Sequence, residues 1–304
     1  MKRSNKQSAL ICFFAFFVLC GCGSSTNETE SPNVAIIAPL PPATSEPVNA
    51  APETKSGFNS LFIGHSFFVP IARGLPEHAE NLGLSDHSQI EEFSGGASGA
   101  PMALWNDQEH RQNIQLVLDT GEVELFAMTY EPSYPTADGY ILWIDYALSK
   151  NPETKIVLGL PWIDFPFDYE DAQDYAKTFA SFHDVNWKNL VETLRVMYPD
   201  IELVSIPYGA AAIRLRSLLQ AGELPGIDEL GGSNWLTSIF RDQKGHGHQN
   251  GILLSVSELI WLSTIYDIDI DSYDYQSDFE ADIKAIAISI IDDYDSDELC
   301  CVNP

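Results

Sequence analysis

Residues able to attack a substrate and to move a proton occur in two short stretches of the chain. The first is Gly64-His65-Ser66, which follows the apolar run 60–64 and precedes a segment with helical spacing. A glycine permits a tight turn at such a junction, and a serine at the head of a helix either caps the helix or acts as a nucleophile. A serine hydroxyl is a weak nucleophile unless a base lies within hydrogen-bond reach, so Ser66 needs a partner from elsewhere in the chain.

The second stretch is the loop 241–251, in which Asp242, His246 and His248 lie among glycines and polar residues. So polar a loop is poor core material, and it directly precedes a long apolar segment. One of its imidazoles could accept the proton of Ser66 while Asp242 orients the ring. The same three side chains could instead ligate a metal ion, because two histidines two residues apart are also a metal-binding pattern.

The elements around these stretches must position them. Five short apolar runs predict buried strands, at 60–64, 89–93, 123–129, 155–160 and 201–207. Spacing or composition predicts helices at 69–82, 102–118, 138–149, within 171–198, and at 210–221, 252–266 and 278–293. Strands that alternate with helices pair in parallel through right-handed crossovers. We therefore expect an α/β fold, a three-layer α/β/α sandwich with a five-stranded parallel sheet.

The carboxyl ends of the predicted strands locate the chemistry without any motif, because open parallel sheets bind ligands just outside those ends. The residues that follow the strands are therefore expected to line one cleft. They are His65-Ser66, Ser94-Gly95-Gly96, Tyr130-Glu131, Pro161-Trp162 and Tyr208-Gly209.

These stretches resemble the sequence blocks of the SGNH (GDSL-type) hydrolases, a family with a flavodoxin-like fold that hydrolyses esters of lipids and carbohydrates. Gly64-His65-Ser66 is similar to the first block, Gly-Asp-Ser or Gly-Asn-Ser, with His65 as the departure. Gly95-Gly96 looks like the second block, whose glycine donates a backbone N–H to the oxyanion. His246, with Gly251 five residues later, is similar to the last block, Asp-X-X-His.

The resemblance implies a serine esterase that needs no cofactor and no metal. Ser66 would be the nucleophile, His246 the base, and Asp242 the residue that orients the base, although Asp242 lies four residues before His246 rather than three. His248 is the second choice of base. The backbone N–H groups of Ser66 and Gly96 would form the oxyanion hole.

One block of the family is absent. Where the pattern requires Gly-X-Asn-Asp, the chain has Met128-Thr129-Tyr130-Glu131, so the asparagine that would complete the oxyanion hole is missing. Either Thr129 or Tyr130 substitutes as the donor, or the hole consists of backbone N–H groups alone. Four side chains near the expected site are predicted substrate contacts, namely His65, Tyr130, Trp162 and His248.

The N-terminal residues predict export. Lys2, Arg3 and Lys6 precede the apolar run 9–19, which is too short to span a bilayer and is typical of a signal peptide, here 1–21. Leu19-Cys20-Gly21-Cys22 resembles the lipobox of bacterial lipoproteins, which implies a lipid on Cys22 and a location in the bacterial envelope, at the outer membrane. Polar, Pro-rich composition predicts a flexible tether over 22–56, followed by a hydrolase domain over 57–295 and an acidic tail over 296–304 with the vicinal cysteines 300 and 301.

Charge narrows the expected partners. The chain has 44 Asp and Glu against 16 Lys and Arg, a net charge of −28. So acidic a protein is not expected to bind nucleic acid or to dock electrostatically on anionic lipid. We expect a small-molecule or polysaccharide ester as substrate, with the lipid anchor as the membrane contact. Two alternatives remain open, a catalytically inactive SGNH-like binding protein and a metal-dependent hydrolase that uses Asp242, His246 and His248.

Overall fold

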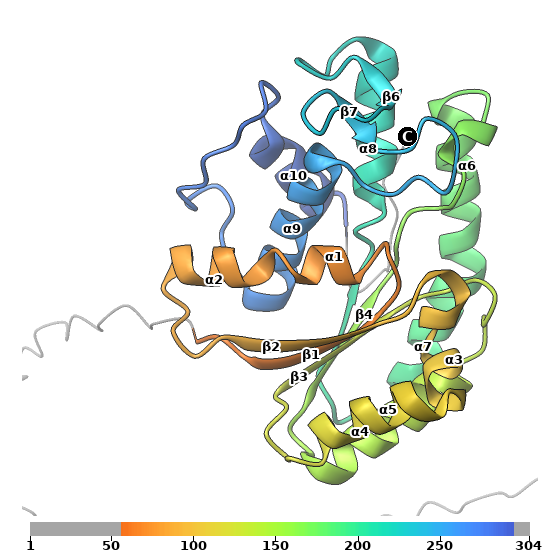
Figure 1. Ribbon diagram of the computed structural model, residues 1–304, viewed down its shortest axis with the longest axis vertical. Helices are drawn as coiled ribbons and strands as arrows, with labels where there is room; N and C mark the ends of the chain where they lie inside the picture. The colour runs from red at the N-terminus through yellow and green to blue at the C-terminus, as the bar shows by residue number, and fades with distance from the viewer. Residues whose placement is uncertain (1–55, 295–304) are drawn as a thin grey trace, which may run out of the picture. The chain divides into compact units, whose positions relative to one another are not determined.

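The computed structural model describes residues 56–294, and it confirms the expected fold class (Figure 1). The central sheet has five parallel strands in the order β2-β1-β3-β4-β5, which is the flavodoxin-like doubly wound order. The strands are β1 (Asn59–Gly64), β2 (Ser88–Phe93), β3 (Leu125–Thr129), β4 (Lys155–Gly159) and β5 (Leu203–Ile206). The predicted signal peptide, the acylated Cys22, the tether up to residue 55 and the tail 296–304 lie outside the described residues.

Helices cover both faces of the sheet, which makes three layers (Figure 1). On one face lie α1 (Val69–Ala72), α2 (Leu75–Leu82), α9 (Gly251–Tyr266) and α10 (Ile283–Asp292). On the other lie α3 (Pro101–Asn106), α4 (Gln108–Leu118) and α5 (Asp138–Lys150). The helix α8 (Ala210–Ala221) packs against α9 and α10. Because both faces are covered, the inner strands are continuous apolar runs and not alternating ones.

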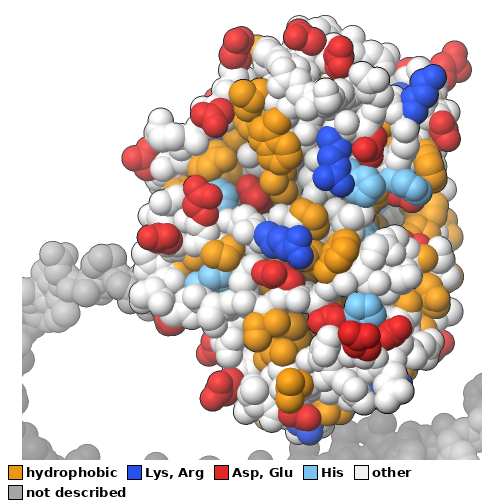
Figure 2. Space-filling model, viewed as in Figure 1, with side chains coloured by type: hydrophobic (Ala, Val, Ile, Leu, Met, Phe, Trp, Pro, Cys, Tyr) orange, Lys and Arg blue, Asp and Glu red, His pale blue; other side chains and the backbone are white. Residues whose placement is uncertain are grey.

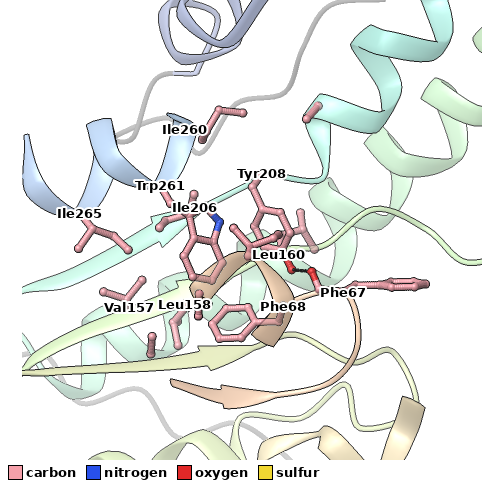
Figure 3. Close-up of a cluster of buried hydrophobic side chains, with 14 of the residues drawn as sticks. Phe67, Phe68, Val157, Leu158, Leu160, Ile206, Tyr208, Ile260, Trp261 and Ile265 are labelled. Atoms are coloured by element: carbon pink, nitrogen blue, oxygen red, sulfur yellow. Dashed lines mark hydrogen bonds between the residues drawn. The ribbon is translucent and has the colours of Figure 1, made fainter. Parts of the chain in front are cut away.

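An aromatic cluster fills the core between the sheet and α9 (Figure 3). Trp261 of α9 stacks on Phe62 of β1 and also contacts Phe68 and Tyr208. The hydroxyl of Tyr208 donates a hydrogen bond of 2.8 Å to the carbonyl oxygen of Phe67, so this buried polar group is satisfied (Figure 3). The cluster therefore fixes the backbone directly after β1, where Ser66 lies.

Three predicted helices are interrupted. The predicted 69–82 helix is two helices, because Pro76 lacks the N–H that a continuous helix would need there and lies instead in the first turn of α2, which begins at Leu75. The predicted 102–118 helix ends and restarts at Asp107, whose carboxylate accepts the backbone N–H groups of Glu109 and His110 as an N-cap. In the third, a π-helical turn, η3 (His183–Trp187), lies between α6 (Ala172–Phe182) and α7 (Lys188–Met197).

A second, two-stranded parallel sheet was not predicted. It pairs β6 (Glu229–Gly231) with β7 (Ser238–Phe240), and each strand is only three residues long. Strands this short carry no periodicity that a sequence pattern could register. The end of β7 nevertheless matters, because it leads directly into the loop that holds Asp242.

The charge visible on the surface agrees with the acidic composition of the chain. Figure 2 shows Asp and Glu side chains spread over the visible face, with few Lys and Arg among them. Within residues 56–294, no helix combines the length and the apolar character needed to cross a membrane.

Candidate active site

The turn after β1 presents Ser66 at the carboxyl end of the sheet. The backbone N–H groups of Phe68 and Val69 both donate to the carbonyl oxygen of His65, at 3.0 Å each, and so close the turn. A Cβ on Gly64 would lie 2.9 Å from the Phe68 ring and 3.0 Å from Thr129, so a glycine is needed where the strand meets the turn. The Ser66 side chain is left partly exposed.

His65 holds this turn against the end of β3. Its Nδ1 accepts the backbone N–H of Phe67 at 3.2 Å, so the ring proton is on Nε2, which donates to the carbonyl oxygen of Tyr130 at 3.1 Å. Burial lowers the pKa of His65, which favours the neutral ring that this pattern requires. The predicted role of His65 as a substrate contact is therefore incomplete, because both ring nitrogens bind the protein itself, although the residue does line the cleft.

Replacing His65 by alanine should lower the free energy of unfolding by about 1–3 kcal/mol at about pH 7.5, because the buried N–H of Phe67 loses its partner and the carbonyl oxygen of Tyr130 keeps only the Thr129 hydroxyl. The difference in free energy of unfolding between the wild-type protein and His65→Ala should shrink at lower pH. The pKa of His65 is lower in the folded protein than in the unfolded chain, where a histidine has a pKa of about 6.5. As the pH falls below that value, protonation of His65 therefore favours the unfolded chain, and the wild-type protein loses the stability that the neutral ring contributes. Urea unfolding of both proteins at about pH 7.5 and about pH 5.5 measures this difference. An equal difference at both pH values would contradict the assignment.

The loop after β7 is a closed hairpin. The backbone N–H of Arg241 donates to the carbonyl oxygen of His248 at 2.9 Å, and Phe240 forms an antiparallel bridge with Gln249. Asp242 and His248 therefore face each other across the base of the hairpin, although six positions separate them in the chain.

Ser66, His248 and Asp242 form a continuous hydrogen-bonded chain. The Nε2 of His248 lies 3.1 Å from Ser66 Oγ, and its Nδ1 lies 2.8 Å from Asp242 Oδ2. The same carboxylate oxygen accepts the backbone N–H of His248 at 3.1 Å. In the neutral imidazole that donates its Nδ1 proton to the carboxylate, Nε2 is the acceptor, and it faces the serine hydroxyl. Burial alone would raise the pKa of Asp242, but the hydrogen bonds and charge of His248 outweigh it and lower that pKa.

The predicted pairing of His246 with Ser66 is wrong in geometry. The His246 side chain is 61% exposed, its Nδ1 lies 3.5 Å from a carboxylate oxygen of Asp164, and its ring packs on Phe165. The error came from the Gly251 spacing, which favoured His246, whereas the hairpin base selects His248. The second choice of base, His248, is accordingly the partner of Ser66, and it also lines the cleft.

The loop between β4 and α6 holds the hairpin in place (Figure 1). The indole N–H of Trp162 donates to the carbonyl oxygen of Gly247 at 2.8 Å, and the Trp162 ring stacks on Phe67 at 4.9 Å. Gly247 has φ +78°, and a Cβ there would lie 2.5 Å from Pro166. Only glycine fits that turn without strain. Trp162 thus lines the cleft, as predicted, and also anchors the loop that carries His248.

Arg216 of α8 supports the loop beside the cleft, and the sequence analysis assigned it no role. The Arg216 side chain is buried, and its guanidinium donates to the carbonyl oxygens of Pro166 and Tyr169. It also lies over the Tyr175 ring, 5.1 Å from the centroid. The signal that could have indicated its buried position was a basic residue on a mostly apolar helix of an acidic protein.

Backbone N–H groups of Ser66 and Gly96 are free to bind an oxyanion. Neither donates a hydrogen bond to another residue within 56–294, and both residues line the cleft. Gly96 has φ +55°. A Cβ on Gly99 would lie 2.5 Å from Ser94 O and 2.8 Å from the backbone of Gly64, so this segment packs tightly on the turn that carries Ser66.

Of the two candidate side-chain donors for the oxyanion, one lies outside the cleft lining and the other has a buried hydroxyl. Thr129 is fully buried and does not line the cleft; its hydroxyl contacts His65 Nε2 and the carbonyl oxygen of Tyr130. The prediction that Thr129 contributes to the oxyanion hole is therefore wrong. Tyr130 does line the cleft, but its hydroxyl is buried without a partner among the described residues, and burial raises its pKa to about 12.

These residues surround a single cleft with a volume of about 390 Å³. Ser66, Gly96 and His248 lie on its lining, together with Glu131, Asp164 and His246. Its apolar wall consists of Phe67, Leu160, Trp162, Ile163, Phe179 and Phe182. The segments after β1, β2, β3 and β4 contribute to the cleft, as the rule for open parallel sheets predicted. The prediction was wrong for Tyr208-Gly209 after β5, which do not line the cleft, because Tyr208 is buried against Trp261 in the core.

The metal-binding alternative required Asp242, His246 and His248 to converge. They do not, because His246 turns toward Asp164 while His248 contacts Asp242. No group of three or more His, Cys, Asp or Glu side chains suited to hold a metal ion occurs within residues 56–294.

Comparisons with known proteins add little to this geometry. No protein-family model matches the chain, and no curated protein matches it. Among solved structures, the chain is similar to the periplasmic domain of a lipopolysaccharide acetyltransferase from Salmonella ser. Paratyphi A. The two share 14% sequence identity over 70% of this chain and 84% of that one, with a TM-score of 0.39. So remote a likeness carries no argument about activity.

Proposed function

We propose that the chain is a serine-dependent ester hydrolase, an esterase or deacylase of the SGNH type. One observation carries the proposal: Ser66 Oγ, the imidazole of His248 and the carboxylate of Asp242 are linked at 3.1 Å and 2.8 Å beside a cleft. A nucleophile, a base within reach and a residue that orients the base are the parts that acyl transfer needs.

The reaction follows from these positions. Ser66 Oγ bonds to the ester carbonyl carbon as His248 Nε2 takes the hydroxyl proton, and the backbone N–H groups of Ser66 and Gly96 bind the oxyanion. The bond from the carbonyl carbon to the alcohol oxygen then breaks, and His248 returns the proton to the leaving alcohol. Water, deprotonated by the same imidazole, then attacks the acyl carbon. The bond from that carbon to Ser66 Oγ breaks, His248 returns the proton to the serine oxygen, and the acid is released. Asp242 holds the ring and stabilises its charged form throughout.

The proposal includes the place of action. The apolar run 9–19 and the lipobox-like Leu19-Cys20-Gly21-Cys22 support an exported enzyme held in the bacterial envelope by a lipid on Cys22. The net charge of −28 argues against nucleic acid or anionic lipid as the partner.

Trapping with a fluorophosphonate tests the nucleophile directly. The probe should label the purified protein at Ser66, as peptide mapping would identify, and Ser66→Ala should lose the label together with p-nitrophenyl acetate hydrolysis. A chelator should leave the wild-type rate unchanged. Chelator-sensitive hydrolysis would support a metal-dependent enzyme instead, and neither label nor hydrolysis would support an inactive binding protein.

A further inference from the structure

The cleft beside Ser66 has two properties that the proposed reaction does not use. Its apolar wall is larger than a two-carbon acyl group could cover. Its acidic side chains have no Lys or Arg beside them among the described lining residues. Each property restricts the ester that fits, and the two restrictions are independent because they arise from different residues.

The apolar wall comes from three segments that are far apart in the sequence. Phe67 follows β1, Leu160 and Trp162 follow β4, and Phe179 and Phe182 lie at the end of α6. All but Phe182 are buried to at least nine-tenths. The volume of about 390 Å³ lies in the range of clefts that enclose most of a small organic ligand.

Several of these rings are fixed by contacts within the protein. Phe67 lies between Trp162 and the edge of His248, with centroid distances of 4.9 Å and 5.5 Å. Trp162 is held by its hydrogen bond to Gly247. Phe182 is partly exposed, and it is the last residue of α6 before the π-helical turn. A ligand that covers this wall removes apolar surface from water without first having to order it.

Charge on the lining is negative. Glu131 and Asp164 line the cleft, and no Lys or Arg is among the described residues that do so. Of the three lining histidines, His65 is held neutral by its hydrogen bonds, and His248 is committed to Ser66 and Asp242. His246 lies 3.5 Å from Asp164. A substrate carboxylate or phosphate would therefore meet like charge and no fixed cation.

We infer that the enzyme selects esters whose apolar part extends several carbons beyond acetyl and which carry no negative charge. Phe179 and Phe182 determine the length of the apolar part that fits. Asp164 and Glu131 repel esters with a negative charge and so act as a charge filter. This inference rests on the proposed function, because it concerns the same cleft. The apolar part could belong to the acyl group or to the alcohol, so the test measures both.

The first experiment measures kcat/KM in two ester series. One varies the acyl chain from acetate to octanoate with p-nitrophenol as the leaving group, and the other varies the alcohol from ethyl to octyl acetate. Each buried methylene is worth about fourfold, so at least about a tenfold rise is expected across one series. Phe182→Ala should reduce that rise severalfold, whereas Val196→Ala, whose side chain is 81% exposed on α7, should leave it unchanged. Flat profiles in both series would overturn the length selection.

The second experiment isolates charge. The p-nitrophenyl monoester of glutaric acid matches p-nitrophenyl pentanoate in chain length but ends in a carboxylate. It should react at least about tenfold more slowly at low salt, with the gap narrowing as salt is added. Asp164→Asn should reduce the rate difference between the two matched esters. Glu170→Gln makes an equal charge change at an exposed residue outside the cleft lining, and it should leave that difference unchanged.

Equal rates for the two matched esters would overturn the charge filter. Failure of the proposed function is distinguishable from these results, since it would abolish turnover of every ester together with fluorophosphonate labelling of Ser66.

Discussion

Replacing His248 by alanine should reduce kcat for p-nitrophenyl acetate by roughly 10³ to 10⁶, because Ser66 then has no base within hydrogen-bond reach. His246→Ala is the matched control. It removes the same imidazole from the same loop, two positions away, but from a ring whose charged neighbour is Asp164. The control should keep its rate within about tenfold of the wild-type rate.

Two further measurements make the comparison decisive. Fluorophosphonate labelling of Ser66 should be slowed strongly in His248→Ala and little in His246→Ala. Far-ultraviolet circular dichroism and thermal unfolding should show that both variants are folded, since neither ring is part of the core. If His246→Ala lost activity while His248→Ala kept it, the hairpin would not be holding the base that we assign.

Asp242→Asn should lower kcat by about 10³ to 10⁴ with little change in fold. The physical reason is the tautomer of His248. An asparagine amide can donate to Nδ1, which moves the ring proton to Nε2, and that nitrogen can no longer accept from Ser66. Asp164→Asn is the matched control, because it alters the carboxylate next to the other histidine and should keep its rate within about tenfold.

The pH dependence of the wild-type rate bears on the same residue. Since the hydrogen bonds and charge of His248 hold the pKa of Asp242 below its usual value of 3.8, its carboxylate stays ionised as the pH falls toward that value. Any decline in kcat/KM at mildly acidic pH should then reflect another group. NMR of the His248 ring nitrogens in Asp242→Asn would measure the tautomer, and an unprotonated Nε2 in that variant would contradict the explanation.

The strands were predictable because of how they are buried. A strand covered on both faces must be apolar along its whole length, and β1, β3 and β4 differ from the predicted runs by two residues or fewer at each end. The helix breaks were harder to predict. Asp107 interrupts a segment with the composition of one long helix, and the π-helical turn in 183–187 depends on packing that no periodicity records.

At the candidate site, the sequence selected Ser66, Asp242 and the glycine segment that lines the cleft, but it gave His248 only as the second choice of base. A choice between two histidines two positions apart depends on which backbone groups pair at the hairpin base. Those pairs, Arg241 with His248 and Phe240 with Gln249, follow from β7, a strand too short to recognise in advance. Thr129 was misassigned for a related reason, since the orientation of a side chain at the end of a strand depends on what packs beneath it.

The closed base of that hairpin has a consequence for how such sites are sought in other sequences. Backbone pairing across the base, and not the number of intervening residues, brings Asp242 to His248. The tip, 243–245, can therefore lengthen or shorten in evolution while the two side chains stay in register. A search pattern with a fixed interval between acid and base would overlook such variants, whereas one that allows a variable insert between two paired positions would retain them.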